Sequence, residues 1–191
     1  MIEDFIEKWP LRGSELARVW NDSDYTDIEF NIENGGVKAI HLSHYNHETK
    51  DKRKYFSNKY SSSDLEKLCQ SILFELGFSC ILENEIVYNP ISGKQVTSLD
   101  TTTNGVRMDI RSITENRNKT IENALKAKRK QLHKFNAENN TELDSLILYF
   151  HEPSYFRKEP VVEGLQGCLK KIICVFGDGN YEIIEKITDP N

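Results

Sequence analysis

Apolar residues recur with helical spacing in two long segments of the chain. In the first, Ser63-Asp64-Leu65-Glu66 has the pattern of a capping box, and apolar side chains then follow at intervals of three and four residues until Gly77. The second segment, residues 120–138, has the same amphipathic spacing. Both patterns predict a helix with one apolar face to bury.

Other segments have the apolar patterns of strands. Residues 105–113, "GVRMDIRSI", alternate between apolar side chains and Arg107, Asp109 and Arg111, which is the period of two expected of a strand with one exposed face. Further strands are predicted over residues 37–44, 78–89, 144–150, 170–177 and 180–187, and a short helix after Pro160. This order of helices and strands predicts an α+β domain with a central sheet.

Residues 1–34 have a different character from the rest of the chain. They contain two short helical patterns around Trp9 and Trp20, interrupted by a proline and a glycine. A chain of 191 residues is long enough for one domain with an extension. We therefore interpret residues 1–34 as an N-terminal helical accessory segment and residues 35–191 as the α+β domain.

The composition, with 38% hydrophobic and 29% charged residues, is typical of a soluble globular protein. The longest apolar runs are far shorter than the roughly 20 residues of a membrane helix, and the first ten residues are acidic where a signal peptide would be basic. The four cysteines lack paired metal-site spacing and are expected to be buried thiols in a reducing compartment. We expect no membrane contact and a cytoplasmic location for the chain as written.

Charge is unevenly distributed along the chain. The net charge of −5 argues against non-specific coating of nucleic acid, but residues 119–134 contain six Lys or Arg and one Glu. The same run is typical of the solvated face of a helix, so both interpretations stay open. If this surface contacts nucleic acid, the candidate residues are Arg107, Lys126, Lys128, Arg129, Lys130 and Lys134.

Three of the five histidines stand at three-residue intervals in residues 35–47, "GGVKAIHLSHYNH". Histidines with this spacing can converge on zinc only in a helix or tight turn, because a strand would direct His41 and His44 to opposite faces. No acidic or cysteine ligand stands at metal spacing beside them, so we expect no bound metal or other cofactor. Two interpretations remain: polar residues at a strand end, or acid–base catalysts.

Acid–base chemistry on RNA would use these residue types. Cleavage without a metal needs a base for the 2′-hydroxyl, an acid for the leaving 5′-oxygen and a cation for the phosphate. Imidazole, with a pKa of about 6.5, can take either proton role at pH 7. Lys38, His41 and His44 supply all three types of group within seven residues.

Five segments in order resemble a known group of nuclease domains: "GGVKAIHLSH", "LEKLCQSILFELGFSCILENE", "NGVRMDIRSIT", "KTIENALKAKRKQLHKF" and "DSLILYF". They are similar to the barnase/EndoU/colicin/RelE-like domains of polymorphic toxins, which occur in contact-dependent inhibition toxins and phage head proteins. The resemblance covers about residues 34–185. It implies a small, mostly antiparallel sheet packed against helices, and an endoribonuclease that cleaves RNA, including tRNA, without a metal. It also implies a cognate immunity protein, and delivery as a toxin domain or with a phage particle.

The motifs of these domains carry over residue by residue. The implied catalytic residues are Lys38, His41, His44, Glu66, Glu83 or Glu85, Asp109 and Arg111. Arg111 stands where a lysine is expected, and it keeps a cation for phosphate but cannot act as a proton donor. The sequence after the second histidine also departs from the expected H-x-F-D, which leaves the role of His47 open.

Two other classes of protein fit some of the same residues. Glu66, Glu83 or Glu85, and Asp109-Ile110-Arg111 imitate the restriction-endonuclease P-D…(D/E)-x-K pattern, in which carboxylates hold Mg²⁺, although the lysine is missing. The negative net charge also fits a non-catalytic phage or immunity-type protein that binds through an acidic face. Without either role, Asp109 and Arg111 would be surface residues of a strand and Glu66 a helix-capping carboxylate.

Overall fold

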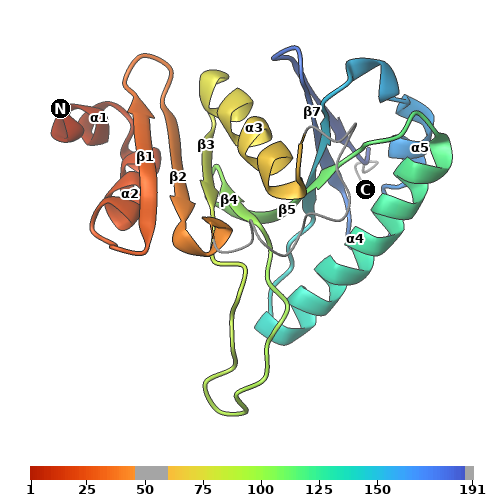
Figure 1. Cartoon of the computed structure of the whole chain (residues 1–191), viewed down its shortest axis with the longest axis horizontal. Helices are drawn as coiled ribbons and strands as arrows, with labels where there is room; N and C mark the ends of the chain where they lie inside the picture. The colour runs from red at the N-terminus through yellow and green to blue at the C-terminus, as the bar shows by residue number, and fades with distance from the viewer. Residues whose placement is uncertain (46–59, 188–191) are drawn as a thin grey trace.

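The computed structural model describes residues 1–45 and 60–187 (Figure 1). His47, whose role the sequence left open, lies outside the described residues. The α-helices of the described residues are α1 (Ile2–Lys8), α2 (Pro10–Trp20), α3 (Ser62–Glu75), α4 (Asn118–Asn139) and α5 (Lys158–Glu163). Each of them is too short or too polar to cross a membrane.

The strands of the described residues form one sheet in chain order, from β1 to β8. They are β1 (Tyr25–Asn31), β2 (Gly36–His41), β3 (Ser79–Leu82), β4 (Thr101–Thr103), β5 (Val106–Ser112), β6 (Ser145–Phe150), β7 (Lys171–Phe176) and β8 (Tyr181–Glu185). Four of the seven pairings are antiparallel, and β2–β3, β5–β6 and β6–β7 are parallel. The expected α+β fold with a mostly antiparallel sheet packed against helices is therefore confirmed.

Helices cover both faces of the sheet. Helix α3 lies across one face of the sheet, as Figure 1 shows. It packs Leu65, Cys69 and Leu73 against inward-facing residues of β2, β3 and β5 to β7. Helices α4 and α5 cover the opposite face of β5 to β8. Helices α1 and α2 pack on the β1–β2 end of that opposite face, where Phe5 and Leu16 contact Val37.

The cap of α3 differs from the sequence prediction. Ser61, not Ser63, is the N-cap: its hydroxyl accepts a hydrogen bond from the Asp64 amide (3.1 Å), and the Asp64 carboxylate accepts one from the Ser61 amide (2.8 Å). A run of three serines offers several hydroxyls, and Asp64 stands at the right distance from the first of them. Glu66 is therefore outside the capping box.

Strands β1 and β4 were not predicted from the sequence. In β1 the pairing with β2 shifts register between Thr26 and Glu29, around Asp27 with φ +51°, so the strand does not show a simple alternation. Strand β1 joins residues 1–34 to the sheet, and their division from residues 35–191 stays a prediction. The predicted strands at 37–44 and 78–89 are shorter than expected, ending at His41 and Leu82.

The direction of the strands brings several segments to one edge of the sheet. Strands β2, β3, β5, β6 and β7 run in the same direction, because β2 and β3 are parallel, β3 and β5 are both antiparallel to β4, and β5 to β7 are parallel. Their C-terminal ends form what we call the carboxyl edge. The N-terminal end of α3 lies at this edge because α3 leads back into β3, and the β3–β4 connection projects from it (Figure 1).

Candidate functional site

Two aspartates are held side by side at the carboxyl edge. Asp100 directly precedes β4, Asp109 lies in β5, and the pairing of Thr101 with Met108 sets them opposite each other. The Asp100 amide donates a hydrogen bond to Asp109 Oδ1 (3.2 Å), and the Ile110 amide donates one to Asp100 Oδ2 (3.0 Å). The register of two strands therefore positions the Asp100–Asp109 pair.

The electrostatic environment of this pair is unfavourable for two negative charges. Burial raises the pKa of the Asp109 carboxyl well above its ordinary value, the neighbouring Asp100 raises it further, and Lys128 opposes both effects. Burial also raises the pKa of Asp100, and Glu66 of α3 adds to this rise. Three carboxyl groups are thus electrostatically coupled, and a cation among them would relieve their repulsion.

Helix α4 contributes a lysine to the same place. The Lys128 ammonium forms an ion pair with Asp109, and the two side chains are only 17% and 5% exposed. Lys128 Nζ also donates a hydrogen bond to Gln131 Oε1 (3.0 Å), and Gln131 Nε2 donates one to the Ser98 carbonyl (3.0 Å). The ammonium is thereby oriented by α4 and by the segment leading into β4.

A second group lies at the same edge, formed by His44, Glu66 and Glu85. His44 is 1% exposed in the single 3₁₀ turn after β2, and its Nε2–H donates to the Glu83 carbonyl oxygen at 2.7 Å. Its Nδ1 lies 3.5 Å from Glu85 Oε1 and 3.8 Å from Glu66 Oε2. These residues each offer a metal-ligating atom within 4.8 Å of the others, and Glu66 also acts electrostatically on Asp100.

The predicted trio of Lys38, His41 and His44 does not come together at one point. Lys38 lies on the α3 face of the sheet, with Nζ 3.0 Å from Glu29 Oε1 and 5.0 Å from the centre of the Phe74 ring. His41 lies on the other face, since residues three apart on a strand point to opposite sides. His41 Nδ1 is 2.9 Å from Ser43 Oγ. The acid–base role of Lys38 and His41 stays a prediction.

Glu83 has a set of partners different from those of Glu85. Its buried carboxylate accepts hydrogen bonds from Arg18 Nη2 (2.6 Å), Thr102 Oγ1 (2.6 Å) and the Tyr25 hydroxyl. Burial alone would raise the pKa of Glu83, but these hydrogen bonds and the Arg18 charge outweigh it, so the pKa is lowered. Glu83 connects α2 to the sheet, while Glu85 faces His44.

The remaining cationic candidates are spread over several surfaces. Arg111 is exposed on β5, and Arg107 donates a hydrogen bond to the Leu99 carbonyl (2.7 Å). Arg129 donates one to the Gly164 carbonyl (2.8 Å) and so connects α4 to the loop after α5. A basic stripe of exposed residues follows one side of α4, repeating every four residues: Lys126, Lys130 and Lys134.

This basic stripe is turned away from the Asp100–Asp109 pair. Lys128 stands two residues after Lys126, which corresponds to a rotation of about 200° around the helix axis. Lys134 also has an intrahelical partner, Glu138, at 3.6 Å. The nucleic-acid contacts of the stripe stay a prediction from the sequence.

Sequence reasoning missed Asp100 and assigned Lys128 another role. Asp100 stands before three threonines in a segment without clear periodicity, but Asn104-Gly105, midway between Asp100 and Asp109, is a typical two-residue hairpin turn and could have predicted their pairing. Lys128 is one cation in a basic run, and nothing in its local sequence distinguishes it from Lys126 or Lys130. Its position opposite Asp109 depends on the packing of α4.

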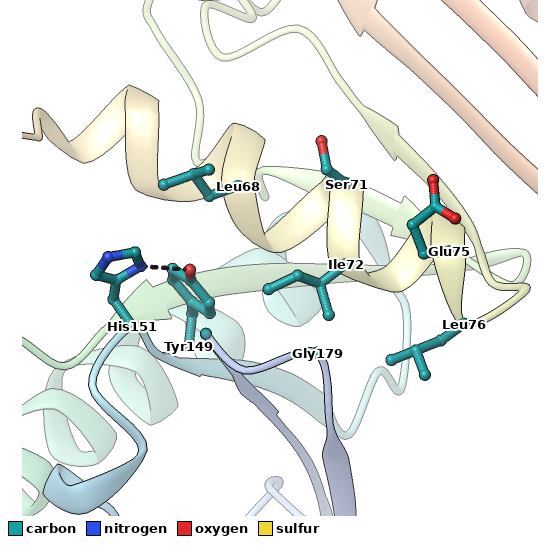
Figure 2. A pocket seen from close by; sticks show the side chains of 9 residues that line it. Leu68, Ser71, Ile72, Glu75, Leu76, Tyr149, His151 and Gly179 are labelled. Atoms are coloured by element: carbon teal, nitrogen blue, oxygen red, sulfur yellow. Dashed lines mark hydrogen bonds between the residues drawn. The ribbon is translucent and has the colours of Figure 1, made fainter.

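A separate pocket of about 500 Å³ lies between α3 and the ends of β6 and β7 (Figure 2). Leu68, Ile72 and Leu76 line it from the helix, and Tyr149 lies below them with its hydroxyl 2.8 Å from His151 Nδ1. The carboxyl groups of the Asp100–Asp109 pair are absent from its lining. The pocket is mainly apolar and is therefore a less suitable place for phosphate chemistry.

Comparisons with known proteins give little further information. Neither a protein-family model nor a curated protein matches the chain. Among solved structures, a chain of the CdiA-CT/CdiI toxin and immunity complex from Burkholderia pseudomallei is similar, with a TM-score of 0.43 and 15% sequence identity. The match covers 70% of this chain and 90% of that chain. Similarity at this level does not establish a shared function, so the assignment depends on the geometry of the site.

Proposed function

We propose that the chain is a nuclease that depends on a divalent cation and whose active site consists of Glu66, Asp100, Asp109 and Lys128. The observation that supports this most directly is the contact of Lys128 with Asp109 beside Asp100. The linear pattern Asp109-x-Arg111 lacks the lysine of a D-x-K motif. Lys128 supplies that lysine in space, from a helix that follows the strand.

The residues present fit a divalent cation. Carboxylate oxygens are the ligands that Mg²⁺ prefers, and Glu66, Asp100 and Asp109 are coupled carboxyls in which repulsion and burial raise the pKa of both aspartates. A divalent ion held there polarises a phosphoryl oxygen and lowers the pKa of water. This is the chemistry that hydrolysis of a phosphodiester requires.

Lys128 has a complementary role in this proposal. Its ammonium is oriented by Asp109 and by Gln131, so it is held in place before a substrate arrives. There it donates hydrogen bonds to a phosphate oxygen and stabilises the negative charge that develops in the transition state. RNA is the substrate class implied by the sequence resemblance, and an RNA-cleaving toxin with an immunity partner is the biological setting that we propose.

The test measures cleavage of total tRNA and of plasmid DNA by the purified chain, with Mg²⁺ or with EDTA. We expect cleavage that requires Mg²⁺ and that falls by at least about 10²-fold in Asp109→Asn and in Lys128→Met, because each removes a charge from the reacting centre. Lys119→Met is the matched control, since Lys119 is an exposed lysine of the same helix that pairs with Glu122.

Each of three other outcomes would contradict the proposal. Cleavage in EDTA that is lost in His41→Ala would identify the metal-independent ribonuclease implied by the resemblance. No cleavage of either substrate under any condition would favour a non-catalytic binding protein. Full activity in both Asp109→Asn and Lys128→Met would remove these residues from the active site.

A further inference from the structure

The second group at the carboxyl edge has the arrangement of a metal site. His44 donates its Nε2–H to a backbone carbonyl, that of Glu83, at 2.7 Å. This hydrogen bond orients the ring and directs Nδ1 toward the carboxylates of Glu66 and Glu85. Metal-ligating histidines commonly donate their other ring nitrogen in this way, because the bond fixes the ring orientation and strengthens the ligand.

The separations between the ligand atoms also fit a shared ion. His44 Nδ1 lies 3.5 Å from Glu85 Oε1 and 3.8 Å from Glu66 Oε2. Ligands about 2.0–2.2 Å from a metal ion are separated from each other by about 3.0–3.5 Å in tetrahedral or octahedral geometry. The two distances from His44 Nδ1 are within a few tenths of an ångström of this range, and all three ligand atoms lie within 4.8 Å of one another.

The three ligands come from separate parts of the fold that are each held firmly. His44 belongs to the 3₁₀ turn after β2, and Glu66 to the first turns of α3. Glu85 follows β3, and its amide donates to Ser43 Oγ at 3.3 Å, one residue before His44. A site built from a buried imidazole and two partly buried carboxylates is preorganised, because the backbone elements already position each ligand.

We propose that His44, Glu66 and Glu85 form a binding site for a divalent transition-metal ion such as Zn²⁺. Imidazole as a ligand favours such ions over Mg²⁺, which prefers oxygen. Three protein ligands leave a coordination position for water or substrate, as in catalytic rather than structural zinc sites. This inference goes beyond the proposed nuclease activity, because an ion can bind here whether or not Asp109 and Lys128 act on phosphate.

The test measures zinc binding by the full, tag-free chain after treatment with EDTA and removal of the chelator. Calorimetric titration with Zn²⁺, with metal analysis of the dialysed protein, gives the stoichiometry and affinity. We expect one bound ion in the wild type, and an affinity lower by at least about 100-fold in His44→Gln and in Glu85→Gln. His133→Gln is the matched control, because it removes an exposed histidine of α4 that is no part of this group.

A fourth variant separates this inference from the proposed function. Asp109→Asn should lose nuclease activity and still bind zinc with nearly wild-type affinity, and circular dichroism without metal should show that every variant is folded. Because His44 is buried, Glu85→Gln is decisive if His44→Gln does not fold. The inference is overturned by no tight binding to the wild type, by unchanged affinity in Glu85→Gln, or by a loss of affinity in Asp109→Asn alone.

Discussion

Replacing Glu83 with glutamine tests the assignment of Glu83 as a structural residue and of Glu85 as a ligand of the proposed zinc site. The Glu83 side chain is 6% exposed and accepts hydrogen bonds from Arg18 of α2, from Tyr25 of β1 and from Thr102 of β4. Glutamine has nearly the same shape but no charge. Its amide nitrogen is a donor and cannot accept the hydrogen bonds that Arg18, Tyr25 and Thr102 donate to the carboxylate. The substitution therefore removes the ion pair and leaves at least one donor without an acceptor.

The size of the effect follows from these contacts. A hydrogen bond to a charged group contributes about 1.5–3 kcal/mol, and breaking a buried ion pair costs about 3–5 kcal/mol. Arg18 is 43% exposed, so water recovers part of this loss. We expect the free energy of unfolding to fall by about 2–4 kcal/mol, which corresponds to a decrease in Tm of roughly 4–16 °C for a chain of this length.

The lowered pKa of Glu83 determines how the stability difference changes with pH. The pKa of Glu83 is lowered in the folded state, so the carboxylate stabilises the fold above its unfolded pKa of about 4.3. This contribution is lost as the pH falls through the lower, folded pKa. The difference in stability between the wild type and Glu83→Gln should therefore be largest near pH 7 and become smaller below about pH 4.

Urea unfolding of both proteins, followed by circular dichroism at several pH values, measures this difference. Glu29→Gln is the matched control, because Glu29 is 58% exposed and its ion pair with Lys38 should contribute only about 0–1 kcal/mol. Equal stability of Glu83→Gln and wild type at pH 7, or a difference that does not change with pH, would refute the reasoning. A loss of zinc binding in folded Glu83→Gln, with wild-type zinc affinity in Glu85→Gln, would reverse the two assignments.

Two further predictions follow from the packing of the sheet and from the basic stripe. Gly36→Ala should lower the free energy of unfolding by about 1–3 kcal/mol, because a Cβ there would lie 2.5 Å from the Phe74 carbonyl oxygen; an unchanged urea midpoint would contradict this. Reversing Lys126 and Lys130 together to Glu should raise KM for RNA and reduce the dependence of binding on salt by about one unit of log–log slope per lost phosphate contact. The value of kcat should remain unchanged because the stripe is turned away from Lys128, and an unchanged KM would remove the stripe from the RNA-binding surface.

Local periodicity was sufficient to predict much of the fold. Helix α4 was expected at residues 120–138 and spans Asn118–Asn139, and β5 was expected at residues 105–113 and spans Val106–Ser112. Strands β6 and β7 were recognised as continuous apolar runs. These elements bury one face or both. Burial of one face gives a periodic apolar pattern and burial of both faces gives a continuous apolar run, and each can be recognised in the sequence alone.

Elements without a simple repeat could not be predicted in this way. Strand β1 has intermediate burial at nearly every position and a register shift, and β4 has only three residues, all threonines. The cap of α3 depended on which serine of a run begins the helix, and the hydrogen bonds of the folded state select Ser61. Each serine of this run offers a similar capping signal, so the sequence alone does not decide between them.

The candidate site depends on tertiary structure to a greater extent. Sequence identified Glu66, Asp109 and His44 as candidates, because these residue types carry the expected chemistry within recognisable motifs. The β4–β5 hairpin, closed by Asn104-Gly105, brought Asp100 against Asp109, and only the packing of α4 placed Lys128 there. Whether two residues distant in the chain come into contact depends on how whole elements pack, and a local sequence pattern does not contain that information. The separation of His41 from His44, by contrast, follows from local structure: His41 ends β2 and His44 lies in the 3₁₀ turn after it.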